Sequence, residues 1–193
     1  MRAALLFVLT LMLLPSTLAA QEGPKNNRKA WPDPRQEPTQ KPRNLPPLEG
    51  RVYVGEPAPD FELDAANGKT VRLSHLRGDW VLIAFVDRKE QLAALRTIEK
   101  DMLQLGARIV GVAHEKSQSL ANYSARQNLS FLMLSDLTGE ISATYGLFDH
   151  ERSETRPGYL MIDRDGIVRM AVLGQTLPAE DVAHFSRFAM TGR

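Results

Sequence analysis

The sequence predicts an α/β domain with a mostly parallel or mixed central sheet that is covered by helices on both faces. From residue 51 onward, short apolar, β-branched or aromatic stretches alternate with helix-like stretches. Single helices between successive strands are typical of a sheet covered in this way. None of the 193 residues is cysteine, but a domain of about 140 residues buries enough surface to fold without disulfides.

The amino terminus, residues 1–20, is typical of a signal peptide. Arg2 precedes an apolar run, 3–14, which ends at a proline and is followed by small residues. The run is shorter than the roughly 20 apolar residues of a membrane-spanning helix. We therefore expect export to the periplasm or the medium, with no stable membrane insertion after cleavage; an uncleaved anchor is the alternative. Cleavage after Ala19 and cleavage after Ala20 both fit.

Residues 21–50 predict a proline-rich, disordered tether. Prolines alternate there with polar and charged residues, and this composition cannot bury enough apolar surface to offset the entropy of ordering. Trp31 is the one large apolar group in the segment, and we expect it to be exposed. The folded domain is therefore expected to span 51–193.

The strands of the sheet are predicted from stretches that are β-branched, aromatic or almost continuously apolar. No internal repeat is visible in the sequence. In chain order, the strand-like stretches are 61–63, 70–73, 81–86, 108–113, 131–134, 159–163 and 167–173.

The clearest predicted helix spans 89–105, where apolar residues recur at three- and four-residue steps. Asp87 and Glu90, three residues apart, fit an N-cap and its capping-box partner. Gly106 is a typical helix terminator. We therefore expect one continuous helix, with a buried face formed by Leu92, Leu95, Ile98, Met102 and Leu105.

Three further helices are predicted at 117–127, 138–145 and 178–190. In the last of them, Pro178 lies in the first turn, where its missing N–H group is not needed. The apolar residues of this helix also repeat at helical spacing. The expected buried face consists of Val182, Phe185, Phe188 and Ala189.

The composition disfavours several classes of function. Basic and acidic residues nearly cancel, with a formal net charge of +1, so no global field attracts nucleic acid or anionic lipid. The histidines are widely spaced, without close partners for a metal ion. No Gly-x-Ser-x-Gly motif indicates a serine hydrolase. We therefore expect no nucleic-acid partner, no metal and no cofactor.

Several segments, taken in order, carry a resemblance to a known family. The opening segments 54–63 (VGEPAPDFEL), 67–78 (NGKTVRLSHLRG) and 80–85 (WVLIAF) resemble the start of the AhpC/TSA family, the peroxiredoxins and their redoxin relatives. The resemblance covers about residues 52–190 without a large insertion. Later segments that resemble the family are 106–113 (GARIVGVA), 131–136 (FLMLSD), 145–147 (YGL) and 156–168 (RPGYLMIDRDGIV).

This resemblance implies a thioredoxin-like three-layer sandwich that includes an N-terminal β-hairpin. It also implies thiol peroxidase or thiol–disulfide activity in antioxidant defence, and homodimers, which are common among the relatives. These expectations of activity rest on analogy at the level of the fold and family.

The sequence departs from the family where the reactive thiol should lie. In the family, the strand that matches 81–85 leads to a loop with Pro, Thr and the peroxidatic cysteine. Here, residues 85–90 read FVDRKE, and Arg88 stands near the position of that cysteine. The nucleophile in this chemistry is ionised sulfur, which neither arginine nor aspartate supplies. The sequence therefore assigns no catalytic residue.

Arg156 matches the arginine that holds the thiolate and the peroxide in the family, because it stands three residues before Tyr159. Pro157 lies one residue from the place of the cis-proline of thioredoxins, and the sequence does not decide the isomer.

In the fold that the resemblance implies, the start of the 89–105 helix faces the loop that contains Arg156. Arg88, Lys89 and Arg156 therefore predict a site for a small anion or for a carboxylate on a protein partner, at a helix end with partial positive charge. The alternative is that Asp87 caps the helix and neutralises the site, while Arg88 and Lys89 are merely solvated.

Two functions from different classes fit the sequence. The first is a pseudoenzyme: an exported, non-catalytic binding or scaffold protein. The second is a redoxin-type oxidoreductase with an antioxidant role, which family resemblance supports and the missing thiol opposes.

Overall fold

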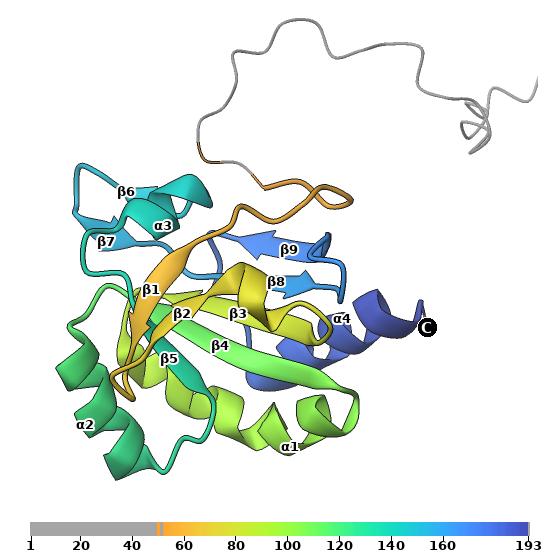
Figure 1. Cartoon of the computed structure of the whole chain (residues 1–193), viewed down its shortest axis with the longest axis horizontal. Helices are drawn as coiled ribbons and strands as arrows, with labels where there is room; N and C mark the ends of the chain where they lie inside the picture. The colour runs from red at the N-terminus through yellow and green to blue at the C-terminus, as the bar shows by residue number, and fades with distance from the viewer. Residues whose placement is uncertain (1–49, 51, 193) are drawn as a thin grey trace, which may run out of the picture. The chain divides into compact units, whose positions relative to one another are not determined.

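A seven-stranded mixed sheet forms the centre of the computed structural model (Figure 1), with the strand order β2-β1-β5-β4-β3-β8-β9. The three central strands β5, β4 and β3 run parallel, whereas β1, β8 and β9 are antiparallel to their neighbours. The mixed sheet was predicted, and its strand bounds differ from the predicted ones by one or two residues. The strands are β1 Glu62–Ala65, β2 Thr70–Arg72, β3 Trp80–Val86, β4 Ala107–Ala113, β5 Leu132–Ser135, β8 Gly158–Ile162 and β9 Val168–Leu173.

The structure describes residue 50 and residues 52–192. All of them lie in one unit, Leu45–Arg193. The predicted signal peptide and, apart from Gly50, the predicted tether lie outside the described residues. Within the described residues, no helix is long and apolar enough to cross a bilayer.

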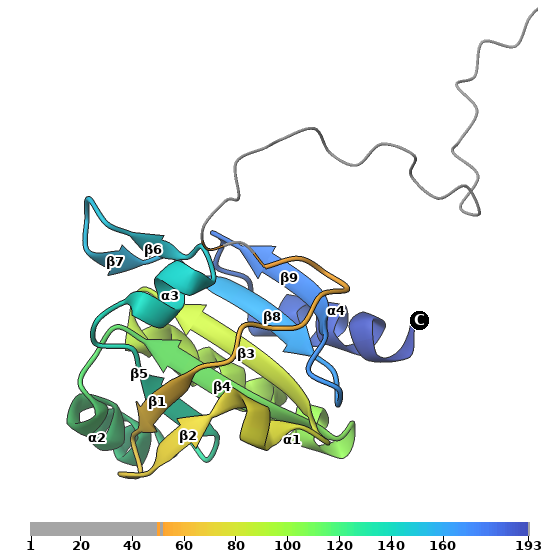
Figure 2. The same ribbon diagram turned by 45° about the horizontal axis from the view of Figure 1, so that its top comes forward.

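Two apolar cores, one on each face of the sheet, hold the layers together. Figure 2 shows the helices on both faces of the sheet. One core contains side chains of α1 (Arg96–Gln104), α2 (Ser117–Gln127) and α4 (Ala179–Thr191). The other contains Phe61, Leu73 and Tyr145, from the N-terminal segment and from around the short helices η1 (Leu73–Leu76) and α3 (Glu140–Thr144). Helices on both faces confirm the predicted three-layer α/β sandwich.

The N-terminal hairpin is tied to the body by polar contacts. Strands β1 and β2 pair antiparallel, as predicted. Just before them, the Asp60 carboxylate accepts hydrogen bonds from the backbone N–H (2.9 Å) and the hydroxyl (2.9 Å) of Ser74 in η1. The buried Tyr145 hydroxyl donates to the carbonyl oxygen of Pro59 at 2.7 Å. These bonds fix the segment that precedes β1 against both η1 and α3.

The predicted continuous helix at 89–105 is wrong in its first half. The segment starts as a 3-10 helix, η2 (Lys89–Leu95), and becomes α-helical only at Arg96. In η2, the Leu92 side chain packs on β4 at Gly111, where a β-carbon would lie 2.7 Å from Leu92 Cδ2. The tighter helix thus approaches the sheet closely. Leu105 is 37% exposed, so it does not belong to the buried face.

The predicted buried face of the last helix is also wrong in part. Phe185 and Phe188 are 44% and 60% exposed, and the buried residues of α4 are Val182, Ala183 and Ser186. The helix buries a face centred between Val182 and Ser186, which leaves Phe188 on the opposite side. Pro178 is the N-cap and so lies just before the first turn.

Candidate functional site

Two parallel strands, β3 and β4, and the antiparallel strand β8 bring the predicted site residues to the same edge of the sheet. Val86 of β3 pairs with Ala113 of β4, and Phe85 pairs with Gly158 of β8. Asp87, Arg88 and Lys89 follow β3, His114 and Glu115 follow β4, and Arg156 precedes β8. We call this group of residues the carboxyl edge. Neighbouring strands are about 4.8 Å apart, so these segments are adjacent.

Asp87 does not cap the helix, which corrects the predicted capping box. The N-cap of η2 is Arg88, with extended backbone angles (φ −134°, ψ 131°) and no side-chain cap hydrogen bond. The first turn closes through the N–H of Gln91, which donates to the carbonyl oxygen of Arg88 at 3.0 Å. Asp87 therefore lies one residue before the N-cap, outside the position from which a side chain reaches the free N–H groups of the first turn.

Lys89 is already paired with a carboxylate. Its ammonium lies 2.5 Å from Oε1 of Glu115, and the two side chains are 19% and 33% exposed. The hydrogen bond between them raises the pKa of Lys89 and lowers the pKa of Glu115. The charge of Lys89 is thus largely balanced within the domain.

Arg156 is also paired, but with a different segment. Its guanidinium donates to Oδ2 of Asp149 at 2.8 Å, while 61% of the arginine side chain stays exposed. Asp149 also accepts the N–H groups of Glu151 (3.1 Å) and Arg152 (3.2 Å) through Oδ1. The hydrogen bond from Arg156 holds the pKa of Asp149 below its usual range. Arg156 therefore fixes a turn as well as facing solvent.

Arg88 is the exception among the three cations. It is exposed, and its guanidinium has no hydrogen bond or ion pair with any other residue from 50 and 52–192. The three predicted cations therefore share an edge of the sheet without sharing a partner. Asp87, the neighbour of Arg88, is exposed as well.

The sequence did not predict the hairpin that stands beside this edge. Strands β6 (Phe148–Asp149) and β7 (Glu154–Thr155) pair antiparallel. The Phe148 ring makes edge contacts with His114 and His150, at centroid distances of 5.5 and 5.1 Å. His114 Nε2 is 2.8 Å from the carbonyl oxygen of Leu137. The signal in the sequence was Asp149, because aspartate readily bonds the backbone N–H groups of the turn that follows it.

On the other side of the edge, the loop 174–178 lies against the first turn of η2. The Gln91 amide donates to Thr176 Oγ1 at 3.4 Å, and the Tyr159 hydroxyl donates to the carbonyl oxygen of Leu177 at 3.5 Å. Burial raises the pKa of the Tyr159 hydroxyl, and the Asp87 carboxylate adds to this effect. The peptide bond before Pro157 is trans, like every other peptide bond among the described residues.

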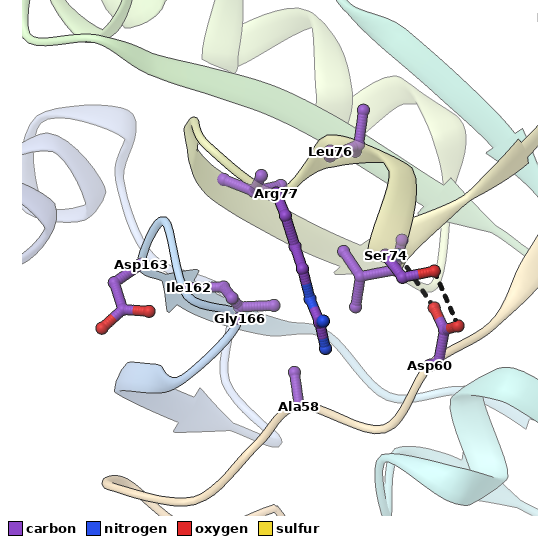
Figure 3. Close-up of a pocket in the computed structure, with 10 residues that line it drawn as sticks. Ala58, Asp60, Ser74, Leu76, Arg77, Ile162, Asp163 and Gly166 are labelled. Atoms are coloured by element: carbon purple, nitrogen blue, oxygen red, sulfur yellow. Dashed lines mark hydrogen bonds between the residues drawn. The ribbon is translucent and has the colours of Figure 1, made fainter.

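A small pocket at the opposite end of β3 is too small for a ligand. Arg77 extends across it toward Ala58 (Figure 3), and a β-carbon on Gly166 would lie 3.3 Å from Arg77 Nε. The cavity measures about 20 Å³, which holds about one water molecule. In the described part of the chain, no group of three or more His, Cys, Asp or Glu side chains is placed to hold a metal ion.

Comparison with known proteins relates the chain to one family. The model of the AhpC/TSA family matches residues 54–171. The selenocysteine-containing peroxiredoxin PrxU of Peptoclostridium acidaminophilum is 28% identical over 134 residues, which cover 61% of this chain and 66% of that protein. Peroxiredoxin Bcp of Bacillus subtilis is 24% identical over 127 residues, which cover 60% of this chain and 81% of that protein.

Solved structures confirm the fold. Peroxidoxin BcpB from Mycobacterium tuberculosis superimposes with a TM-score of 0.66 at 20% identity, over 74% of this chain and 98% of that one. Enterococcus faecalis AhpC gives a TM-score of 0.64 at 15% identity, over 74% of this chain and 97% of that one. At these identities, the likeness concerns the fold alone. The region that matches the family model, 54–171, includes the end of β3, where this chain carries Asp87-Arg88-Lys89.

Proposed function

This chain belongs to the AhpC/TSA family but contains no cysteine, and we propose that it is an exported binding protein without peroxidase activity. The observation that carries the proposal is the segment Asp87-Arg88-Lys89 at the end of β3, within the region that matches the family. Peroxide reduction by this family's chemistry needs an ionised sulfur. The side chains of these three residues can bind a ligand, but they cannot donate electrons to a peroxide.

The proposed ligand is an anionic group, either a small anion or a carboxylate on a partner protein. Arg88 supports this choice because it is exposed and its guanidinium is unpaired among the described residues. Arg156 supports it because most of its side chain is exposed, although one side of its guanidinium binds Asp149. Arginine presents several N–H donors in a plane and suits carboxylates.

A titration of sulfate and citrate against thermal stability tests this proposal at constant ionic strength. We expect the melting temperature of the wild type to rise saturably with either anion, because binding to the folded state stabilises it. Arg88→Ala and Arg156→Ala should each reduce the rise. Arg72→Ala is the matched control, since Arg72 is an exposed arginine that pairs with Glu62 in the distant β1–β2 hairpin.

Two results would count against the anion site. One is a wild type whose melting temperature does not respond to either anion. The other is an equal response in wild type and Arg88→Ala, which would move any binding away from the carboxyl edge.

Export is the second part of the proposal, and the sequence of residues 1–20 supports it. Mass spectrometry of the protein recovered from outside the cytoplasm tests it. We expect a mature chain that starts at Ala20 or Gln21. An intact chain that starts at Met1 and stays with the cytoplasmic fraction would contradict export.

A further inference from the structure

A groove opens at the edge of the sheet opposite the carboxyl edge. It lies where β4 and β5 begin, between these strands and the second half of α1, and its volume is about 400 Å³. This is within the range of about 300–1,000 Å³ that is typical of small-molecule sites. It shares no residue with the carboxyl edge.

The walls of the groove are apolar. Ile109 (3% exposed) and Phe131 (9% exposed) line the groove and are also packed within the apolar core. Leu103 of α1 lines the groove as well, yet its side chain is 57% exposed. A ligand with an apolar body would cover Leu103 and remove its surface from water, which is favourable.

The polar groups of the groove are mainly acidic. Glu99 accepts a hydrogen bond from the Ser130 hydroxyl through Oε1 at 2.7 Å. Asp79 binds Arg108 Nε through Oδ2 at 2.6 Å. In the described part of the chain, no donor binds the second oxygen of either carboxylate. Among the charged residues that line this groove, Asp79 and Arg108 balance each other, and Glu99 is paired with no cation of the described residues.

We propose that this groove binds a small organic ammonium, that is, a primary amine attached to an apolar or aromatic body. The ammonium donates to the free oxygen of Glu99, and the apolar body packs against Leu103 and Phe131. A carboxylate of the same shape is repelled by Glu99, and a neutral alcohol lacks the charge-assisted hydrogen bond. This inference does not depend on the proposed function, because it concerns the other edge of the sheet.

Three probes of one shape test the proposal: phenethylamine, 2-phenylethanol and 3-phenylpropanoate, each titrated into the ¹⁵N-labelled full chain. We expect saturable shifts of the amide signals of residues 103–109 and 130–132 with the amine. The dissociation constant should be on the order of 1 mM, which is typical of a ligand of this size. The alcohol should bind about tenfold more weakly and the carboxylate more weakly still.

Variants separate the charge from the apolar wall. Glu99→Gln should reduce the preference for the amine over the alcohol by roughly threefold or more, because it removes the carboxylate that has no cation partner. Leu103→Ser should weaken all three probes alike. Phe188→Ser is the matched control, since Phe188 is an equally exposed apolar residue, 60% exposed, on another helix. Phe188→Ser should leave the binding of all three probes unchanged.

The proposal is overturned if the amine causes no saturable shift, or if the carboxylate binds as well as the amine. It is also overturned if Glu99→Gln keeps the full preference for the amine, or if Phe188→Ser weakens binding as much as Leu103→Ser does. Because all three substituted side chains are exposed or half-exposed, the variants are expected to fold.

Discussion

At the scale of single residues, the end of β3 shows what replaces a reactive thiol. The family resemblance places Arg88 near the position of the peroxidatic cysteine, and its neighbours in the chain are Asp87 and the already paired Lys89. A thiolate is stabilised by unpaired cations and by a helix N-terminus. Here Lys89 is paired with Glu115, and one side of the Arg156 guanidinium is paired with Asp149. A thiol at position 88 would have the Asp87 carboxylate beside it and no unpaired lysine next to it.

We therefore expect that a thiol placed at position 88 is not activated. In Arg88→Cys, the thiol pKa should stay near or above the ordinary value of about 8.5, because Asp87 adds a negative charge beside it. Ser117→Cys is the comparison. Ser117 starts the longer helix α2, which has no acidic residue in its first turn and no side-chain cap, so its thiol pKa should be lower.

The pH dependence of alkylation by iodoacetamide measures both thiol pKa values. A pKa below about 7 for the thiol at position 88 would show that the site still activates sulfur, contrary to our interpretation.

Asp163, in the β8–β9 turn, links stability to pH. Burial by itself raises the pKa of Asp163, but hydrogen bonds from the N–H groups of Ile167 and Asp165 and from Arg169 outweigh it, so the pKa is lowered. A pKa that is lower in the folded state gives stability that is present above the unfolded value of about 3.9 and is lost as the pH falls through the folded value.

Asp163→Asn should therefore reduce the free energy of unfolding at pH 7 by about 1–3 kcal/mol, because the carboxylate accepts several hydrogen bonds. Below about pH 4, the difference from wild type should shrink. Urea unfolding between pH 3 and pH 7 measures this difference in the free energy of unfolding. The control is Asp165→Asn at an exposed position in the same turn, which should follow the wild type. A constant difference at every pH would contradict the linkage.

At the scale of elements, the short hairpin β6–β7 depends on one close contact. Gly139, before α3, has a φ of 74°, and a β-carbon on it would lie 2.2 Å from Cε2 of Phe148. The Phe148 ring thus rests directly on the backbone, and it contacts both His114 and His150. Two features require a glycine at position 139: the positive φ angle and the closeness of the Phe148 ring.

Gly139→Ala should therefore destabilise the domain more than Gly174→Ala. Gly174 has a similar φ of 77°, but nothing lies within 4 Å of a β-carbon placed on it. Gly174→Ala should cost about 1–2 kcal/mol of backbone strain, and Gly139→Ala about 1–3 kcal/mol more from overpacking. Urea unfolding gives both values, and the ¹H signals of His114 and His150 should shift only in Gly139→Ala. Equal destabilisation by the two variants would show that Phe148 does not rest on Gly139.

The elements also show which sequence signals were sufficient. Helix α2 begins and ends where its pattern predicts, at Ser117 and Gln127. The 89–105 segment has the apolar repeat of an α-helix, yet its first half is a 3-10 helix, because close packing on Gly111 is a property of the folded pair and leaves no trace in the repeat. Phe188 has the right spacing for a buried face, but the position of the sheet decides which face is covered.

At the scale of the whole molecule, the alternation of strands and helices was enough to predict the sheet and its layers. The fold implied by the family resemblance was needed to predict that Asp87, Arg88, Lys89 and Arg156 lie at one edge, where the strand pairing does place them. The partners of these residues could not be predicted in the same way. The pairs of Lys89 with Glu115 and of Arg156 with Asp149 join different loops, and such pairs depend on side-chain positions that only the folded chain defines.

The central proposal is that the AhpC/TSA fold is present here without peroxidase activity, and consumption of hydrogen peroxide tests it most directly. The purified chain is incubated with hydrogen peroxide and dithiothreitol in the presence of EDTA, and again with thioredoxin, thioredoxin reductase and NADPH. Because the chain has no cysteine to form the thiolate, we predict that peroxide and NADPH disappear at the rate of the buffer control. A rate that rises in proportion to the concentration of the chain, and that unfolding abolishes, would contradict the claim.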